Sequence, residues 1–187
     1  MWESCGAIVL AGGRATRLGG VDKAGIELHG RTLLAHALDA VVDAADVVVV
    51  GDPVPTERPV TFVREDPAFG GPVAALGAGL EHLATAPWLV VLAVDMPRVT
   101  FGTVQRLRRT AAQGGDGAVL VDPDGRRQLA FVARRDAVAA AVPGLEERHG
   151  LPLRVLLDAL RLIPEAARGE EHRDVDGWDD LRDLADA

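Results

Sequence analysis

Short apolar runs rich in β-branched residues recur along the chain and predict buried strands. Runs that are apolar at every position, and not only at alternate ones, are typical of strands with both faces covered. The predicted strands are residues 5–10, 46–50, 60–63, 89–94, 118–121 and 129–133. We therefore expect a sheet that lies inside the domain.

Helical patterns occupy most of the intervals between these strands. Leu34 and Leu38 share one face of the first pattern, Pro72 opens the second, and Thr100 is a favourable N-cap for the third. The predicted helices are residues 32–42, 72–83, 100–112, 152–160 and 178–185. The chain after residue 136 is expected to hold only the last two of these helices, joined by an Arg- and Glu-rich segment, residues 168–173.

Helices that alternate with apolar strands predict an α/β fold, a three-layer sandwich around a mainly parallel sheet. The length of 187 residues is typical of one domain, so we assign residues 1–187 to a single domain. Ligands of such folds bind beyond the carboxyl ends of the strands. We expect the cleft near Leu10, Val50 and Val94.

The charge balance and the single cysteine restrict the classes of partner. With 28 acidic and 20 basic residues the net charge is −8, which argues against a nucleic-acid or anionic membrane partner. Cys5 is the only cysteine, so neither an internal disulfide nor a cysteine-based zinc site is expected. No signal peptide or membrane span is recognisable, and we expect a cytoplasmic protein. Any anionic ligand must be held by a local site.

The loop after the first strand, VLAGGRATRLGGVDK, holds the only lysine of the chain, Lys23; the other nineteen of the twenty basic residues are arginine. Gly12 and Gly13 allow unusual backbone angles and a close approach of N–H groups to an anion, and Arg14 and Arg17 add charge. A triphosphate site would use arginine forks and one lysine point charge. Alternatively, the glycines serve a turn and the lysine is accidental. The standard phosphate-loop and dinucleotide motifs are absent.

Acidic residues follow two other predicted elements. Asp95 follows strand 89–94 at the expected ligand edge, where it would either bind Mg²⁺ together with substrate phosphates or cap a turn. Asp66 precedes the Gly71–Pro72 start of a helix. This loop would either accommodate a nucleoside against its small residues or be a plain proline-punctuated loop.

Four segments together resemble one family. LAGGRATRLGGVDK (10–23) closely resembles the signature LAGGxSxRMGxxK of molybdenum cofactor guanylyltransferases, the molybdopterin-guanine dinucleotide biosynthesis protein A family of the nucleotidyltransferase superfamily. EDPAFGGPVAALGAGL (65–80), VLAVDMP (91–97) and DVDGWDDL (174–181) follow in the family's order. The resemblance spans nearly the whole chain.

The resemblance implies the nucleotide-diphospho-sugar transferase fold, with a Rossmann-like sheet. It implies transfer of GMP from GTP to the terminal phosphate of molybdenum-molybdopterin, with release of pyrophosphate and with Mg²⁺ as cofactor. The implied catalytic residues are Arg17, Lys23 and Asp95; the nucleotide-binding residues are Leu10, Ala11, Gly12, Gly13, Lys23, Asp66, Gly71, Pro72 and Asp95; the metal ligands are Asp95 and, in a contributory role, Asp176. We expect a monomer that makes transient contacts with molybdenum cofactor biosynthesis or acceptor proteins.

The C-terminal segment departs from the family pattern, which often has asparagines and Thr-Pro where this chain has Asp174, Asp176, Gly177 and Trp178. Asp176 would therefore either bind the metal or serve as a helix N-cap, and the same alternatives stay open for Asp174. Two other functions also stay open. One is a related transferase that uses CTP or activates a sugar or lactyl phosphate, although paired glycines favour guanine. The other is a nucleotide-binding regulatory module without turnover.

Basic residues outside these motifs are left with alternative roles. Arg106, Arg108 and Arg109 are predicted to form a solvated helix face, with a basic patch for an acidic partner as the alternative. The segment from Arg126 to Gln128 opens a strand, and would either face an anionic second substrate or form a hairpin rim. The histidines share no metal-ligand spacing.

Overall fold

The computed structural model describes residues 4–12, 19–66, 68, 70–83 and 86–186. The helices are α1 (Leu33–Ala40), α2 (Pro72–His82), α3 (Phe101–Ala111), α4 (Arg135–Ala141), α5 (Leu153–Ala159) and α6 (Trp178–Asp186), with a short 3₁₀ helix, η2 (Lys23–Gly25). The strands are β1 (Cys5–Leu10), β2 (Glu27–Leu28), β3 (Arg31–Thr32), β4 (Asp46–Val50), β5 (Thr61–Val63), β6 (Trp88–Ala93), β7 (Gly117–Val121), β8 (Arg127–Arg134) and β9 (Leu162–Ala166). Nearly all of the predicted elements are present within one or two residues of their expected bounds.

Seven strands form the central sheet in the order β5-β4-β1-β6-β8-β7-β9. The pairs β5–β4, β4–β1, β1–β6 and β7–β9 are parallel, and β8 is antiparallel to both of its neighbours. Six of these strands therefore point the same way, and their carboxyl ends meet at one edge. The prediction of a mainly parallel sheet is confirmed.

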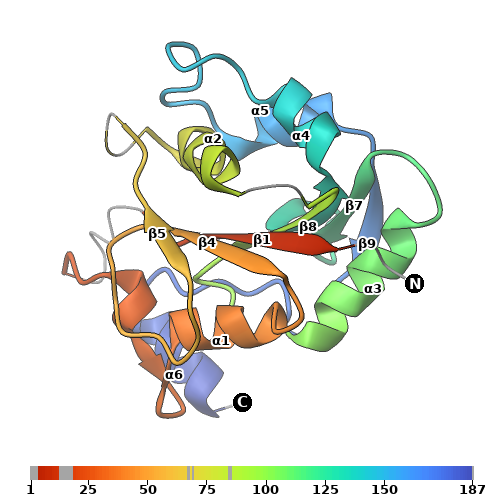
Figure 1. Cartoon of the computed structure of the whole chain (residues 1–187). Helices are drawn as coiled ribbons and strands as arrows, with labels where there is room; N and C mark the ends of the chain where they lie inside the picture. The colour runs from red at the N-terminus through yellow and green to blue at the C-terminus, as the bar shows by residue number, and fades with distance from the viewer. Residues whose placement is uncertain (1–3, 13–18, 67, 69, 84–85, 187) are drawn as a thin grey trace.

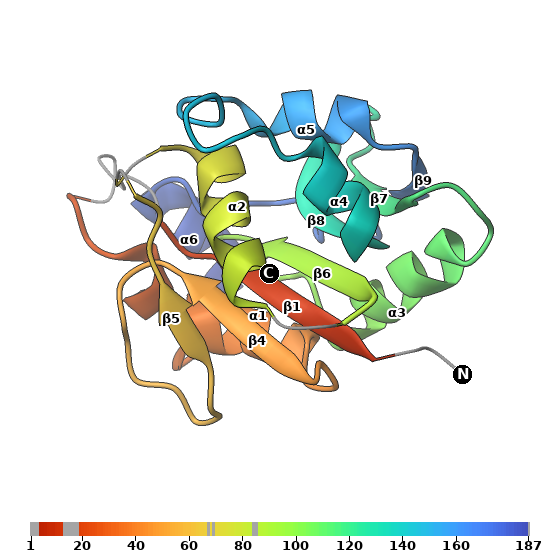
Figure 2. The ribbon, with the colours of Figure 1, turned by 45° about the horizontal axis from the view of Figure 1, so that its top comes forward.

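Helices cover both faces of this sheet, as Figures 1 and 2 show: α2, α4 and α5 lie on one side, and α1, α3 and α6 on the other. Successive residues of β1 alternate between the two resulting cores. Ala7 and Val9 pack with the α1 and α3 side, whereas Ile8 and Leu10 pack with the α2 and α5 side. Every residue of β1 is buried, which is why its sequence is apolar throughout.

Local signals explain where several helices begin. The Thr100 hydroxyl and the Thr103 backbone and side chain form a capping box at the start of α3, and the Thr32 side chain accepts a hydrogen bond from the Ala35 N–H at the start of α1. Pro72 stands at the first position of α2, after Gly71, whose φ of 86° strongly favours glycine. These starts agree with the sequence-based interpretation.

The sequence pattern did not predict β9, α4, the short η2 or the β2–β3 hairpin. β9 contains Pro164, which an edge strand tolerates although it weakens a sequence-based strand assignment. The hairpin turns at His29 and Gly30, with φ of 52° and 74°, and strands of two residues are too short for a visible alternation.

The prediction of a solvated arginine face on α3 is wrong for Arg106 and Arg108. Both side chains are buried, and each forms ion pairs: Arg106 with Glu165 and Glu171, and Arg108 with Asp43. A sequence shows the spacing of charges but not their distant partners, which neutralise and hydrogen-bond these guanidinium groups. Arg109 is exposed, as expected.

No helix within the described residues is both long enough and apolar enough to cross a lipid bilayer.

Candidate active site at the carboxyl edge of the sheet

The loop that follows β1 leaves the middle of the sheet. Its first residue, Ala11, donates its N–H to the Val50 carbonyl of β4 at 2.9 Å, and the Val94 N–H donates to the Leu10 carbonyl at 3.0 Å. The chain after β1 is thus anchored to both neighbouring strands, at the edge where ligands of such folds bind. The ends of the strands at Leu10, Val50 and Val94 therefore lie together, and the ligand cleft that we expect at them stays a prediction.

Two glycines lie at this edge, and the fold requires only one of them to be glycine. Gly12 is exposed, and a Cβ there would lie 3.7 Å from the Val50 carbonyl oxygen, an ordinary contact. Its φ is not in the left-handed region, so the fold does not require a glycine at this position. Gly51 does have to be small, because a Cβ would lie 3.0 Å from the Ala11 Cβ and 3.1 Å from the Ala11 carbonyl carbon. Gly51 was not recognised in the sequence.

Gly13, Arg14 and Arg17, which the sequence assigns to the same loop, lie outside the described residues. Where the description resumes, Gly19 and Gly20 have φ of 75° and 78°, values that favour glycine. Among the described residues of this loop, the unusual backbone angles therefore occur at Gly19 and Gly20, whereas the φ of Gly12 is ordinary.

Lys23 lies between two carboxylates that come from distant parts of the chain. Its Nζ donates to Asp95 Oδ2 and to Asp176 Oδ1, in both cases at 2.9 Å. The lysine side chain is 17% exposed, that of Asp95 23% and that of Asp176 50%. Asp22 helps to place Lys23, because its carboxylate caps η2 by accepting the Ala24 N–H at 3.0 Å. Three residues that were assigned separately from the sequence thus form one charged group.

The carboxylates keep Lys23 protonated. Burial by itself would lower the pKa of Lys23, but the charge of Asp95 and the hydrogen bonds to Asp95 and Asp176 outweigh it and raise the pKa. At neutral pH the group therefore carries a lysine cation that faces two carboxylates. A cation held at this edge is suited to bind the oxygens of an anionic ligand.

A third carboxylate, that of Asp174, belongs to the same neighbourhood. Although Asp174 is exposed overall, partial loss of water around its carboxylate raises its pKa, and so do the like charges of Asp176 and Asp95. Within the described residues, one lysine and three carboxylates therefore lie in the same neighbourhood. The sequence left open whether Asp174 binds a metal or caps a helix, although the alternation of Asp174 and Asp176 around the apolar Val175 was visible there.

The segment that carries Asp174 and Asp176 is held against the end of β6. The Val175 N–H donates to the Asp95 carbonyl at 2.8 Å, and the Val175 side chain is fully buried. Asp180 Oδ2 accepts the N–H groups of Asp176 and Gly177 at 3.0 and 2.8 Å. Asp180 therefore caps these N–H groups, whereas the Asp176 carboxylate accepts a hydrogen bond from Lys23, which argues against the plain N-cap interpretation of Asp176.

The residues assigned to the nucleoside lie in the loop between β5 and α2. Asp66 is exposed, and Gly71 and Pro72 are partly buried at the start of α2. The Gly150 N–H donates to the Gly70 carbonyl at 2.7 Å and holds this loop against the chain before α5. β5 is parallel to β4, so its carboxyl end and this loop share the edge that bears Lys23.

Magnesium fits this edge as an ion shared with substrate phosphates. Within the described residues no group of three or more His, Cys, Asp and Glu side chains could hold a metal ion by itself. Mg²⁺ commonly needs only one or two protein carboxylates, because water and phosphate oxygens complete its octahedral shell. Asp95 and Asp176 are hard oxygen donors that lie near a third carboxylate, that of Asp174, and this donor set fits Mg²⁺.

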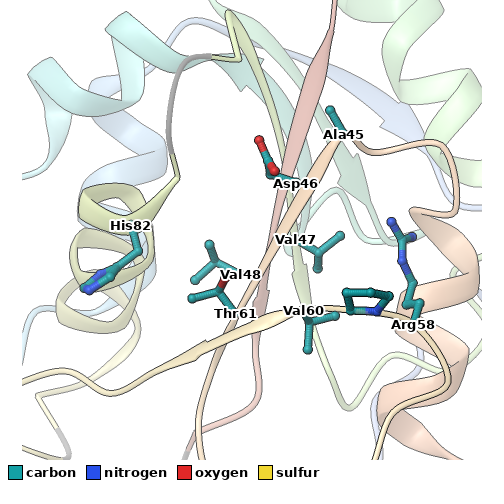
Figure 3. Close-up of a pocket in the computed structure, with 9 residues that line it drawn as sticks. Ala45, Asp46, Val47, Val48, Arg58, Val60, Thr61 and His82 are labelled. Carbon is teal, nitrogen blue, oxygen red and sulfur yellow. The ribbon is translucent and has the colours of Figure 1, made fainter.

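A cavity of about 290 Å³ lies elsewhere, at the start of β4 rather than at its end (Figure 3). Asp46, Val48, Arg58, Thr61 and His82 are among its lining residues. The Arg58 guanidinium donates to the carbonyls of residues 41, 42 and 44, which terminate α1 and the turn after it. Its charge is used within the fold, and we assign this cavity no role in the reaction.

The contacts of the Arg126–Gln128 segment favour the interpretation as the rim of a hairpin over that as a binding site for a second substrate. Arg127 Nη1 donates to the Leu157 carbonyl at 2.8 Å and pairs with Asp158, and Gln128 Nε2 donates to Asp122 Oδ2 at 3.2 Å. Asp122 Oδ1 also accepts the Arg126 N–H at 2.8 Å, which closes the turn. Intramolecular partners thus engage the two side chains that would have faced a second substrate.

Comparison with known proteins identifies the family of this chain. Residues 7–167 match the family described as the MobA-like NTP transferase domain. The chain belongs to this family. It is a nucleotidyltransferase, and the sequence resemblance described above is confirmed. A molybdenum cofactor guanylyltransferase from Cupriavidus taiwanensis is 35% identical over 158 residues, which cover 73% of this nucleotidyltransferase and 75% of the relative.

Solved structures confirm the expected fold of this nucleotidyltransferase. Molybdopterin-guanine dinucleotide biosynthesis protein A from Archaeoglobus fulgidus superposes with a TM-score of 0.73 at 20% identity, covering 97% of each chain. The 2-C-methyl-D-erythritol 4-phosphate cytidylyltransferase from Thermus thermophilus superposes with a TM-score of 0.67 at 20% identity, covering 96% of each chain. At this identity the likeness concerns the fold alone.

Proposed function

We propose that this nucleotidyltransferase transfers GMP from GTP to the terminal phosphate of molybdenum-molybdopterin. The products would be pyrophosphate and the molybdopterin guanine dinucleotide. The observation that carries the proposal is the placement of Lys23 between Asp95 and Asp176 at the carboxyl edge of the sheet, next to the loop after β1. The guanylyltransferase relative and the sequence resemblance support the choice of substrates.

The chemistry requires alignment and charge neutralisation rather than a protein nucleophile. The terminal phosphate of the acceptor attacks the α-phosphorus of GTP in line, and the bond to the pyrophosphate leaving group breaks. This attacker is already ionised at neutral pH, so no side chain has to remove a proton. Lys23 would bind phosphate oxygens as a point charge, and the exposed Gly12 leaves room for them beside the backbone.

Asp95 and Asp176 would hold Mg²⁺ with the phosphates. The ion, when bound, neutralises charge on the phosphates between which the new bond forms. Lys23 Nζ uses two of its three N–H donors on Asp95 and Asp176, so the third would bind a triphosphate oxygen, and release of either carboxylate to the metal would free another donor. In the absence of substrate, Lys23 neutralises the carboxylates that would otherwise repel one another.

Ligand-induced stabilisation tests the choice of nucleotide. GTP with Mg²⁺ should raise the melting temperature more than CTP or ATP at the same concentration, because a ligand that binds only the native state stabilises it by mass action. Lys23→Ala should abolish the GTP effect. Arg161→Ala is a suitable control, because it removes an ion pair with Asp116 at the opposite edge of the sheet.

Product formation tests the reaction itself. Purified molybdopterin and GTP should give pyrophosphate and a guanine dinucleotide in equal amounts, detected by chromatography. Selective stabilisation by CTP would favour a cytidylyl transfer instead. Tight GTP binding without pyrophosphate release would favour a regulatory module and contradict the proposed reaction.

A further inference from the structure

A buried carboxylate connects α3 to the chain that leads into Asp174 and Asp176. Glu171 is 9% exposed and receives three hydrogen bonds. Thr103 Oγ1 donates to its Oε1 at 2.7 Å, Arg106 Nη2 donates to its Oε2 at 2.5 Å, and the Arg168 N–H donates to Oε2 at 2.8 Å. Both oxygens of this side chain are thus engaged away from solvent.

These contacts join two segments that meet again at the active site. Thr103 lies in the first turn of α3, a few residues after Asp95, and Glu171 lies three residues before Asp174. Beyond Glu171 the chain returns to the end of β6, where the Val175 N–H donates to the Asp95 carbonyl at 2.8 Å. The Glu171 contacts and the Val175 bond are therefore two attachments of one short segment to neighbouring parts of the chain.

Arg106 of α3 binds Glu171 and a second carboxylate, that of Glu165, at the same time. Its Nε donates to Glu165 Oε1 at 3.2 Å, so one guanidinium links the end of β9 to the segment after it. Burial alone would raise the pKa of Glu171, but the hydrogen bonds from Arg106 and Thr103 outweigh it and lower the pKa. The carboxylate is ionised at neutral pH, and removing its charge would leave a buried guanidinium incompletely paired.

We propose that Glu171, held by Thr103 and Arg106, is a positioning residue for the nucleotidyl transfer. It fixes the segment after β9 against α3, and this attachment seats Val175 on Asp95 and brings the Asp176 carboxylate to Lys23. The inference rests on the proposed function for its catalytic consequence. The placement of the segment can be measured without any substrate.

The test compares two carboxylates that pair with buried arginines on the same helix. Glu171→Ala removes the partner of Arg106, and Asp43→Ala removes the partner of Arg108, which connects α3 to the chain before β4 instead. Amide hydrogen exchange of peptides that contain Val175 is measured for both variants, and urea unfolding measures their global stability. Glu171→Gln, which keeps an acceptor for Thr103, is a milder variant in case Glu171→Ala does not fold.

We expect Glu171→Ala to accelerate exchange at Val175 at least tenfold beyond what its loss of global stability explains. Asp43→Ala should change this exchange only in proportion to its global stability. Glu171→Gln should give an intermediate rate. Equal acceleration in Glu171→Ala and Asp43→Ala would overturn the proposal, because Glu171 would then act on the fold as a whole.

Turnover provides the second measurement. Glu171→Ala should lower kcat for pyrophosphate release at least tenfold and raise the Mg²⁺ concentration needed for half-maximal rate, whereas Asp43→Ala should retain both values. Wild-type kcat in Glu171→Ala would overturn the catalytic part of the inference. If the wild-type protein itself forms no dinucleotide, the proposed function fails, and the exchange data alone decide whether Glu171 positions the segment.

Discussion

The Nζ of Lys23 lies 2.9 Å from Oδ2 of Asp95, although 72 residues separate the two in the chain. One follows β1 and the other follows β6, and these strands are parallel neighbours in the sheet. Parallel neighbours end at the same edge, so the two side chains are brought together by topology. The single lysine of the chain is therefore the cation of an acidic group, a relationship from which the following predictions start.

Two replacements of Lys23 should show whether catalysis needs only a positive charge at this position or also the compact shape of the lysine ammonium group. Lys23→Ala should lower turnover by about 10²–10³-fold, on the scale of ~2.7–4 kcal/mol for one preorganised electrostatic contact. Lys23→Arg should also lose most activity, because a planar fork does not replace a compact point charge between two carboxylates. The measurement is pyrophosphate release at saturating GTP. Wild-type turnover of Lys23→Arg would show that any cation suffices.

The same substitution should destabilise the substrate-free protein. A lysine on the open surface would be dispensable for folding, but this side chain is mostly buried and bridges Asp95 and Asp176. We expect Lys23→Ala to lose about 1–3 kcal/mol of unfolding free energy in urea, the range for hydrogen bonds to charged groups. Arg161→Ala removes an exposed arginine at the other edge, so its unfolding free energy should stay close to that of the wild type.

Gly12 and Gly51 should respond to alanine in opposite ways. Gly51→Ala should destabilise the fold, because its methyl group would meet Ala11 at 3.0 Å. Gly12→Ala has room and an ordinary φ, so its melting temperature should match that of the wild type. If phosphates approach the Gly12 backbone, Gly12→Ala should nevertheless weaken GTP binding in a thermal-shift titration. Unchanged GTP affinity in a stable Gly12→Ala would place the phosphates elsewhere.

Asp174 should reduce stability at neutral pH. Its pKa is raised in the folded protein, so over the titration range the native state binds more protons than the unfolded state, and stability falls as the pH rises through this range. Because Asp174 is exposed and solvent screens the effect, Asp174→Asn should melt only slightly higher than the wild type at pH 7. The gain should vanish below the ordinary aspartate pKa of about 3.9. Melting curves across this range check the sign, and a constant difference at all pH values would contradict it.

Magnesium dependence should distinguish Asp95 from Asp176. Asp95→Asn should raise the Mg²⁺ concentration for half-maximal turnover at least tenfold, because this carboxylate lies directly beyond β6 and is mostly shielded from solvent. Asp176→Asn should have a smaller effect, because half of its side chain is exposed. Activity should disappear in EDTA and return with added Mg²⁺. Equal Mg²⁺ requirements in both variants and the wild type would exclude the two residues as ligands.

The positions of the main elements were determined by the sequence itself. A strand such as β1 is buried on both faces and must be apolar throughout, so its bounds are visible without any structure. The start of α3 was equally clear, because an N-cap threonine acts on residues within one turn. Burial of a strand and capping of a helix depend on residues that are close together in the chain, so both give a signal that can be recognised in the sequence. The hairpin at His29 and β9 with its proline lacked such a signal.

The loop residues of the candidate site were also apparent, because their spacing resembles a known signature. Only the tertiary structure decided how their charges combine. Whether Arg106 is solvated depends on Glu165 and Glu171, and whether Asp176 caps a helix depends on Asp180 and Lys23. Electrostatic energy depends on distance in space and on burial, and the order of residues along the chain records neither. The fold brings Lys23, Asp95 and Asp176 together because the strands before Lys23 and Asp95 end side by side and the buried Val175 seats the last segment against them.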